Sequence, residues 1–195
     1  MATKALQKII ISKTRLGLLK IFFDQPKESF YIREAVRIVG EEINSVRREL
    51  NNLVEAGLLG KERRGNRLFY FLKKDYPFYH DFLSIMAKVA GLGGEIIKNR
   101  SRLGELKFVA FSSAFLNWEG SQSEVDFLIV GRVVLPEIGK FVVREEKRRG
   151  REINYAVMDL KEFKLRKRSN DPFLINILIK NPVVILGDLQ ELGKI

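Results

Sequence analysis

Residues 30–73 constrain the fold of this chain more than any other segment, because a helical pattern and a hairpin signal follow one another within them. Apolar residues recur at helical spacing in the middle of the segment, namely Ile43, Val46, Leu50, Leu53 and Val54. This spacing predicts a helix with one buried face. The opposite face is expected to be polar and basic, since it carries Asn44, Ser45, Arg47, Arg48, Asn51 and Asn52.

Two runs of β-prone residues follow this helix after Gly57. They span residues 58–62 and 67–72, and the turn between them contains Gly65 and Asn66. Because glycine and asparagine tolerate positive φ, such a pair between two β-prone runs predicts a hairpin. Upstream, the apolar positions of residues 16–23 and 32–39 predict two further helices.

Two short helices, a third helix with a basic face and a basic hairpin resemble a winged helix-turn-helix domain. The REL and EAGLL segments around Arg48 and Gly57 are similar to those of MarR/ArsR-type regulators. The resemblance implies that the third helix enters the major groove of double-stranded DNA and that the hairpin, or wing, lies along the backbone. It assigns the DNA contacts to Asn44, Ser45, Arg47, Arg48, Arg63, Arg64, Asn66 and Arg67. Some domains of this kind contact proteins instead, and that alternative stays open.

The charge of the chain favours an acidic partner. The formal net charge is +11, and residues 1–75 carry +7 of it, with 16 Lys and Arg against 9 Asp and Glu. Nucleic acid is the first candidate and an anionic membrane surface the second. A solvated surface rich in Lys, Arg and Glu is the alternative explanation, and residues 144–151 (REEKRRGR) are more typical of a solvated helix end than of a nucleic-acid site.

Several classes of site are excluded by composition. The chain has no cysteine, so it has no disulfide, thiolate metal site or cysteine nucleophile. His80 is the single histidine and cannot form a multi-histidine metal site. No apolar run approaches the roughly 18 residues of a membrane span, and the N-terminus lacks an adequate signal-peptide core. We therefore expect a cytoplasmic protein without a membrane partner.

The domain organisation is predicted from a change of pattern near residue 90. We expect a first domain at residues 1–75, a linker or dimerisation helix at 76–94, and a second domain at 95–195, with the boundary at the glycines around Gly93. An apolar stripe in the middle segment comprises Phe78, Phe82, Ile85, Met86 and Val89. This stripe either packs on its own domain or forms a homodimer, which would place two recognition helices about one DNA turn apart.

Strands and helices alternate in the second half of the chain. Residues 106–112, 125–130, 152–158 and 183–186 are predicted strands, and helices are expected from residue 95 to 103 and after Pro136, Asp159 and Pro172. The fold class is therefore predicted to be α+β, with a mixed sheet in an α/β second domain.

Two carboxylates in this domain suggest metal chemistry. Glu124 and Asp126 are two residues apart in a predicted strand, so they are expected to project from the same face. Their repulsion would be relieved by a cation, and carboxylate oxygens suit Mg²⁺. Such pairs hold the metals of phosphoryl and nucleotidyl transfer. The alternative is that both side chains only cover the solvent face of an edge strand.

The segment containing Ser113, Glu124 and Asp126 resembles the signature of minimal nucleotidyltransferases, in which a Gly-Ser turn precedes two acids on a strand. The REINY and DPFL segments (residues 151–155 and 171–174) are similar to those of prokaryotic proteins that fuse a winged helix to such a domain. The resemblance implies that Ser112 and Ser113 bind a nucleotide, that Glu124 and Asp126 bind Mg²⁺, and that Ser113, Glu124 and Asp126 form the catalytic set.

The departures from this signature point away from catalysis. Ser112 replaces the family glycine, Glu124 replaces an aspartate, and Asn154 stands where the third carboxylate is expected. The glycine usual shortly after the turn is also replaced, by Leu116 and Asn117. The sequence therefore predicts a DNA-binding transcriptional regulator whose second domain senses a ligand or sets the oligomeric state. The alternative is an active Mg²⁺-dependent nucleotidyltransferase that recruits its substrate through the winged helix.

Overall fold

The computed structural model describes residues 2–119, 124–179 and 182–188. The chain divides into two compact units, Met1–Ala90 and Gly91–Ile195. Its fold class is α+β with a mixed sheet, which confirms the predicted class. Within the described ranges, no helix is both long enough and apolar enough to cross a membrane.

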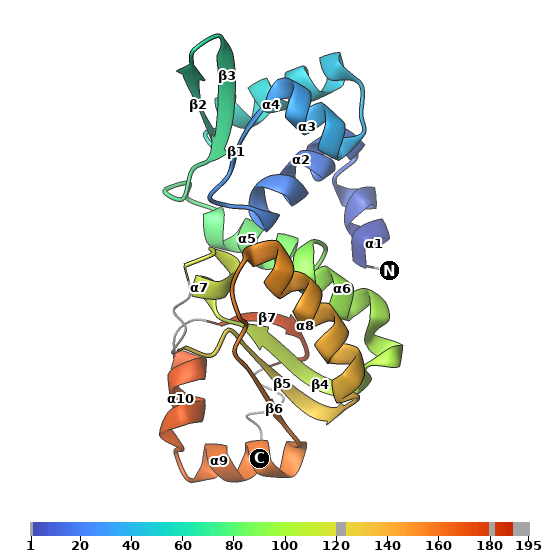
Figure 1. The fold of residues 1–195 in the computed structure, drawn as a ribbon, viewed down its shortest axis with the longest axis vertical. Helices are drawn as coiled ribbons and strands as arrows, with labels where there is room; N and C mark the ends of the chain where they lie inside the picture. Colours follow the sequence, from blue (N-terminus) through green and yellow to red (C-terminus); the bar gives the residue numbers. More distant parts are fainter. Residues whose placement is uncertain (1, 120–123, 180–181, 189–195) are drawn as a thin grey trace. The chain divides into compact units, whose positions relative to one another are not determined.

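The first unit contains five helices and a three-stranded antiparallel sheet among its described residues (Figure 1). Its elements are α1 (Ala2–Ile9), α2 (Lys13–Asp24), β1 (Ser29–Tyr31), α3 (Ile32–Val39), α4 (Ile43–Glu55), β2 (Leu59–Arg64), β3 (Arg67–Leu72) and α5 (Tyr79–Ala87). The strand order β1-β3-β2 places β3 in the centre, with Tyr70 paired to Phe30 on one side and to Lys61 on the other. The predicted helix and hairpin are both present.

Local signals explain where these helices begin and end. Ser12 caps α2, because its hydroxyl accepts the backbone N–H of Arg15 at 3.1 Å. Glu42 caps α4 in the same way, with its carboxylate accepting the N–H groups of Asn44 and Ser45. Between α3 and α4 the chain turns at Gly40, whose φ of +73° favours glycine. The start of α4 is therefore determined by the residues directly before it, Gly40 and Glu42.

One buried carboxylate joins α2 to α4 in this unit. Glu49 is only 4% exposed, and it accepts hydrogen bonds from the Ser12 hydroxyl at 2.9 Å and the Arg15 Nε at 2.8 Å. Burial raises the pKa of Glu49, but the hydrogen bonds from Arg15, Ser12 and Asn52 and the charge of Arg15 outweigh it. The net pKa is therefore lowered below its ordinary value of 4.5.

Helix α5 packs inside the first unit. Tyr79 and Phe82 of α5 both contact the ring of Phe23 on α2, with ring centroids 5.7 and 6.1 Å apart. Of the two alternatives for the apolar stripe, packing on its own domain therefore accounts for Phe82. Phe78 and Ile85 remain 58% and 42% exposed.

The second unit is built on a four-stranded sheet with the order β6-β5-β4-β7. Its elements are α6 (Gly91–Asn99), a 3₁₀ turn η1 (Arg100–Arg102), β4 (Gly104–Phe111), α7 (Ser113–Leu116), β5 (Phe127–Val133), α8 (Leu135–Arg149), β6 (Tyr155–Met158), α9 (Leu160–Arg168), α10 (Pro172–Ile179) and β7 (Val183–Leu186). Strands β5 and β6 are parallel, whereas β4 is antiparallel to both β5 and β7. The sheet is therefore mixed, as the sequence predicted.

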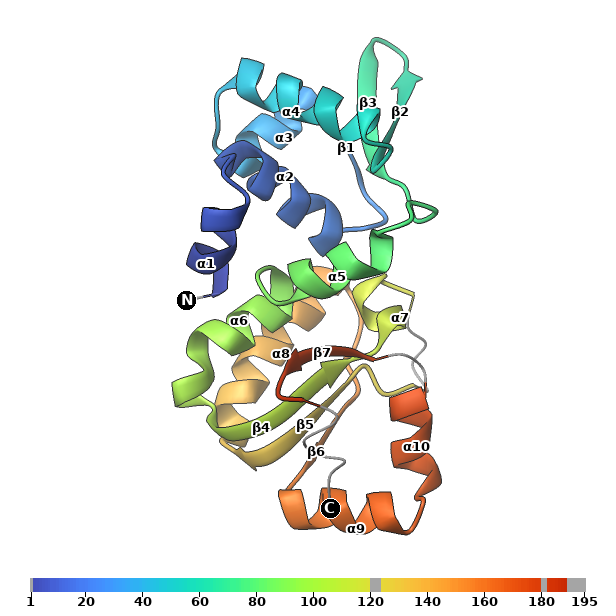
Figure 2. The ribbon, with the colours of Figure 1, turned by 180° about the vertical axis from the view of Figure 1, so that it is seen from behind.

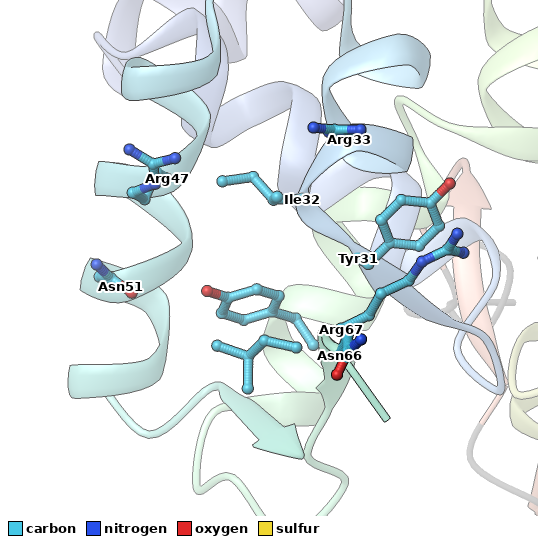
Figure 3. Close-up of a pocket in the computed structure, with 9 residues that line it drawn as sticks. Tyr31, Ile32, Arg33, Arg47, Asn51, Asn66 and Arg67 are labelled. Carbon is cyan, nitrogen blue, oxygen red and sulfur yellow. The ribbon is translucent and has the colours of Figure 1, made fainter. Parts of the chain in front are cut away.

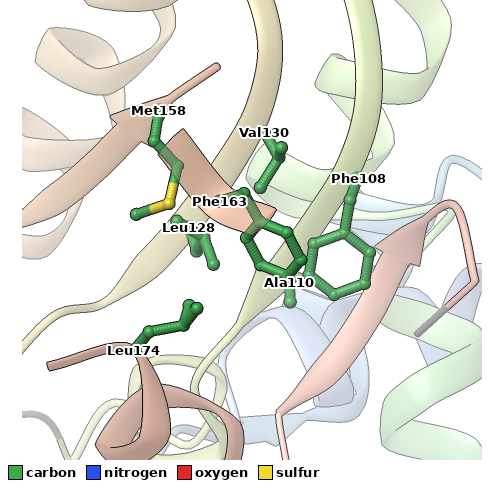
Figure 4. Close-up of a cluster of buried hydrophobic side chains, with 7 residues drawn as sticks. All are labelled: Phe108, Ala110, Leu128, Val130, Met158, Phe163 and Leu174. Atoms are coloured by element: carbon green, nitrogen blue, oxygen red, sulfur yellow. The ribbon is translucent and has the colours of Figure 1, made fainter. Parts of the chain in front are cut away.

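Helices cover this sheet on both faces. On one face, Phe163 of α9 and Leu174 of α10 pack against Phe108, Ala110, Leu128, Val130 and Met158 of the strands (Figure 4). Helix α8 crosses the other face (Figures 1 and 2). The alternate strand residues Val109 and Ile129 are also fully buried. Burial on both faces explains why these strands are continuous apolar runs in the sequence.

The helix expected at residues 95–103 begins four residues earlier, at Gly91. Its glycines therefore lie inside a helix, where glycine costs about 1 kcal/mol relative to alanine. Leu92 and Ile96 lie four residues apart and are both buried, so packing of this face against the unit offsets that cost. The division between the units falls directly before this helix.

We predict that Glu49→Gln lowers the free energy of unfolding of the first unit by about 1–3 kcal/mol at neutral pH, since the charge-assisted hydrogen bonds from Ser12 and Arg15 are weakened. Because the folded-state pKa of Glu49 is depressed, its contribution is present above the unfolded-state pKa and is lost as pH falls through the folded-state pKa. Thermal unfolding followed by far-ultraviolet circular dichroism from neutral to acidic pH measures this. The matched control is Glu55→Gln at an exposed position of the same helix; equal effects of the two variants would contradict the assignment.

Candidate functional site

A groove of about 660 Å³ lies between α4 and the β2–β3 hairpin in the first unit. Its lining comes from β1, α3, α4, β3 and the turn before β3, and it comprises Tyr31, Ile32, Arg33, Arg47, Asn51, Asn66, Arg67, Leu68 and Tyr70. Figure 3 shows Arg47 and Asn51 along α4 on one side of the groove and Tyr31, Asn66 and Arg67 on the other. Segments that are distant in the sequence therefore meet around one concave surface.

The lining of this groove suits an anionic ligand. It contains the three guanidinium groups of Arg33, Arg47 and Arg67 and the two side-chain amides of Asn51 and Asn66, and no carboxylate. Guanidinium groups remain charged at all physiological pH values and match the oxygens of phosphates. The groove therefore has the chemistry of a phosphate-binding surface.

Aromatic rings hold two hairpin arginines in place. Arg67 lies 4.7 Å from the centroid of the Tyr31 ring, and Arg64 lies 5.0 Å from that of Phe69. Arg64 also donates a hydrogen bond to the Ser29 hydroxyl at 3.0 Å and forms an ion pair with Glu62. Arg67 is thus held against Tyr31 in the groove lining, whereas Arg64 braces the hairpin against β1.

Only part of the predicted DNA-contact set meets in this groove. Arg47, Asn66 and Arg67 line it, while the remaining predicted residues lie outside its lining: Asn44, Ser45, Arg48, Arg63 and Arg64. Arg48 and Arg63 are exposed, and Asn44 accepts a hydrogen bond from Arg47 at 3.2 Å. Sequence reasoning missed Tyr31 and Arg33 because they lie before and at the start of α3, one helix and one turn before α4.

In the second unit, Asp126 is at the centre of the segment that resembles a nucleotidyltransferase. The residue is 1% exposed, and both carboxylate oxygens accept hydrogen bonds from Arg151, at 2.7 and 2.9 Å. One oxygen also accepts the backbone N–H of Asn154 at 3.0 Å. The hydrogen bond to Asp126 raises the pKa of Arg151 above its ordinary value, against the lowering effect of burial. The charge of Asp126 is therefore neutralised by a cation from the chain itself.

The backbone of Asp126 joins the same segments. Its N–H donates to the Asn154 carbonyl at 2.7 Å, and its own carbonyl accepts the N–H of Ser112 at 2.8 Å. Asp126 therefore links the end of β4, the start of β5 and the segment before β6 through both its side chain and its backbone. Asn154, the expected counterpart of a third carboxylate, meets Asp126 through backbone groups.

The two acids do not share a strand face, in contrast to the sequence prediction. Strand β5 begins at Phe127, so Glu124 and Asp126 both precede it. Asp126 is buried in its ion pair with Arg151, whereas Glu124 lines a hollow of about 330 Å³. The strand therefore starts two residues later than the expected residue 125. Within the described residues, no group of three or more His, Asp and Glu side chains could hold a metal ion.

The two predicted nucleotide-binding serines also line this hollow, together with Val125 and residues of α10. The Ser112 hydroxyl accepts the backbone N–H of Phe115 at 3.0 Å and caps α7. Ser113 begins that helix. The structure thus brings Ser112, Ser113 and Glu124 together and separates the Asp126 carboxylate from them.

The basic run at residues 144–151 is partly structural, which corrects the interpretation of it as a solvated helix end. The Arg149 side chain is 5% exposed; it donates to the Phe115 carbonyl at 2.7 Å and lies 3.8 Å from the Phe115 ring centroid. Its partner Glu145 is buried. Burial raises the pKa of Glu145, but the hydrogen bonds and charges of Arg148 and Arg149 lower it below its ordinary value. The i, i+3 and i, i+4 spacing of Glu145, Arg148 and Arg149 is the sequence signal for this cluster.

We predict that Arg151→Gln lowers the free energy of unfolding of the second unit by about 3–5 kcal/mol, because the variant leaves a buried carboxylate without its cation. The double variant Asp126→Asn/Arg151→Gln should recover part of this loss. Urea unfolding followed by the fluorescence of Trp118, the only tryptophan of the chain, measures both. Arg132→Gln, at an exposed position of β5, is the control. A double variant that is no more stable than Arg151→Gln would contradict the pairing.

Comparison of the chain with models of protein families, with curated proteins and with solved structures found no match.

Proposed function

We propose that this chain is a DNA-binding transcriptional regulator, with a winged helix-turn-helix domain as its first unit and a non-catalytic nucleotidyltransferase-like domain as its second. The observation that carries the proposal is the groove between α4 and the β2–β3 hairpin, with its three arginines and no carboxylate. The order helix, strand, helix, helix, hairpin supports it further, since it provides a helix and a wing on one surface.

In the proposed complex, α4 and the hairpin contact different parts of the duplex. Helix α4 enters the major groove, where Arg47 and Asn51 are positioned for base edges or flanking phosphates, and the hairpin lies along the backbone. The exposed side chains of Arg48 and Arg63 extend the basic surface on either side. As a homodimer in the cytoplasm, the protein would bind two half-sites about one DNA turn apart.

The contacts of Asp126 support a non-catalytic second unit. A catalytic metal would need the Asp126 carboxylate, and both of its oxygens accept hydrogen bonds from Arg151. A metal ion could bind Asp126 only if the Arg151 side chain moved away from it. The buried charge of the Asp126 carboxylate would then need a new compensating cation. The hollow lined by Ser112, Ser113 and Glu124 remains suited to sensing a small ligand.

We expect Arg47→Gln to weaken binding to double-stranded DNA and to lower the slope of log K against log salt by about 0.9, since one fewer phosphate counterion is displaced. Fluorescence anisotropy with a short labelled duplex at several salt concentrations measures affinity and slope together. Arg100→Gln removes the same charge from an exposed position in the second unit and should leave both unchanged. Absence of duplex binding by the wild type at low salt would exclude the proposed function.

The active-enzyme alternative predicts binding of Mg²⁺ and nucleotide through Asp126. We expect isothermal titration with Mg²⁺ and ATP to give no heat that depends on Asp126, and labelled nucleotide to show no transfer. The test variant is Asp126→Asn, which removes the charge and keeps the capacity to form hydrogen bonds. Its control is Asp75→Asn, at an exposed position in the first unit. Transfer by the wild type that is lost in Asp126→Asn would establish the enzyme instead.

A further inference from the structure

Tyr70 combines burial with an unsatisfied hydroxyl in the groove between α4 and the hairpin. The residue is 4% exposed and lies on β3, the central strand of its sheet. Its side chain lines the groove, yet its hydroxyl has no hydrogen-bond partner among the described residues. Since the described part of the chain has no fully buried side-chain oxygen without a partner, this hydroxyl must reach the open groove. A hydroxyl that lies in the groove without a partner among the described residues can donate a hydrogen bond to a ligand that carries an acceptor oxygen.

The geometry of a duplex on this surface identifies that ligand. If α4 occupies the major groove and the hairpin lies beyond its edge, one phosphodiester strand must pass between them, because a backbone separates the major groove from the minor groove. The Tyr70 hydroxyl faces that path from the floor of the groove. Arg47 and Arg67 line the same path from its two sides.

We propose that the Tyr70 hydroxyl donates a hydrogen bond to a backbone phosphate of the bound DNA, between the contacts made by Arg47 and Arg67. This inference rests on the proposed function and adds a neutral donor at the centre of a cationic surface. Pairing of Tyr70 with Phe30 and Lys61 in the sheet holds the donor in place before DNA arrives. Little conformational entropy is therefore lost at this position on binding.

Burial also keeps Tyr70 in the form that can donate. Loss of hydration raises the pKa of Tyr70 above its ordinary value of 10.0, while the charge of Arg47 acts in the opposite direction. The hydroxyl therefore remains protonated throughout the physiological pH range.

Tyr70→Phe tests the inference because it removes one oxygen and keeps the ring. Because a hydrogen bond to a charged group contributes to binding, we expect the variant to bind a labelled duplex of arbitrary sequence about 10- to 150-fold more weakly, which corresponds to about 1.5–3 kcal/mol. Its slope of log K against log salt should equal that of the wild type, since a neutral donor displaces no counterion. Arg47→Gln, in contrast, should change the slope.

Two controls separate this role from a structural one. Tyr76→Phe removes a hydroxyl outside the groove lining in the same unit and should bind like the wild type. The thermal midpoint of Tyr70→Phe should stay at or above that of the wild type, because the hydroxyl makes no bond in the free protein.

Each outcome of these measurements decides a different point. Equal binding by Tyr70→Phe and the wild type would overturn the inference and leave the proposed function intact. Weaker binding by Tyr70→Phe together with a lower thermal midpoint would have the same consequence. A wild type that binds no duplex would overturn the inference together with the proposed function.

Discussion

A buried carboxylate needs a compensating cation, and the second unit satisfies this need with Arg151. The two hydrogen bonds from Arg151 to Asp126 hold together the end of β4, the start of β5 and the segment before β6. Breaking such a pair leaves an uncompensated charge in a low-dielectric interior. The same guanidinium that stabilises this junction bonds both oxygens of the carboxylate that a catalytic metal would require, so stability and the proposed lack of catalysis would have one physical cause.

The first unit uses the same interaction in a different place. Glu49 of α4 is buried against Arg15 of α2 and against Ser12, which caps α2. These contacts fix α4 to the core while the other face of α4 remains polar. Two groups of arginines can be distinguished in this protein. Arg15, Arg149 and Arg151 each neutralise a buried carboxylate, whereas Arg33, Arg47 and Arg67 line a groove without one. The second group, and not the total charge, carries the argument for nucleic acid.

The groove links this arrangement to function. Its floor is a rigid sheet, one wall is a helix anchored by Glu49, and the opposite wall is a hairpin braced by Arg64 against Ser29 and Phe69. A preorganised surface loses little conformational entropy on binding, and its lining of arginines, amides and the Tyr70 hydroxyl presents donors to a phosphate backbone. The second unit, with Asp126 closed by Arg151, would then act on binding indirectly, through a ligand or through association of subunits.

Local pattern in the sequence was sufficient to predict α4, the hairpin and the alternating strands and helices, because apolar spacing and turn residues act within a few positions. The same rules misjudged the starts of α6 and β5. In α6, the burial of Leu92 and Ile96 offsets the cost of the glycines. The Asp126–Arg151 pair and the meeting of Tyr31, Arg47 and Tyr70 around one groove join residues at least 16 positions apart, and no local pattern encodes such pairings. Only the tertiary structure decided them, since burial determines which charges must be paired and which donors stay available.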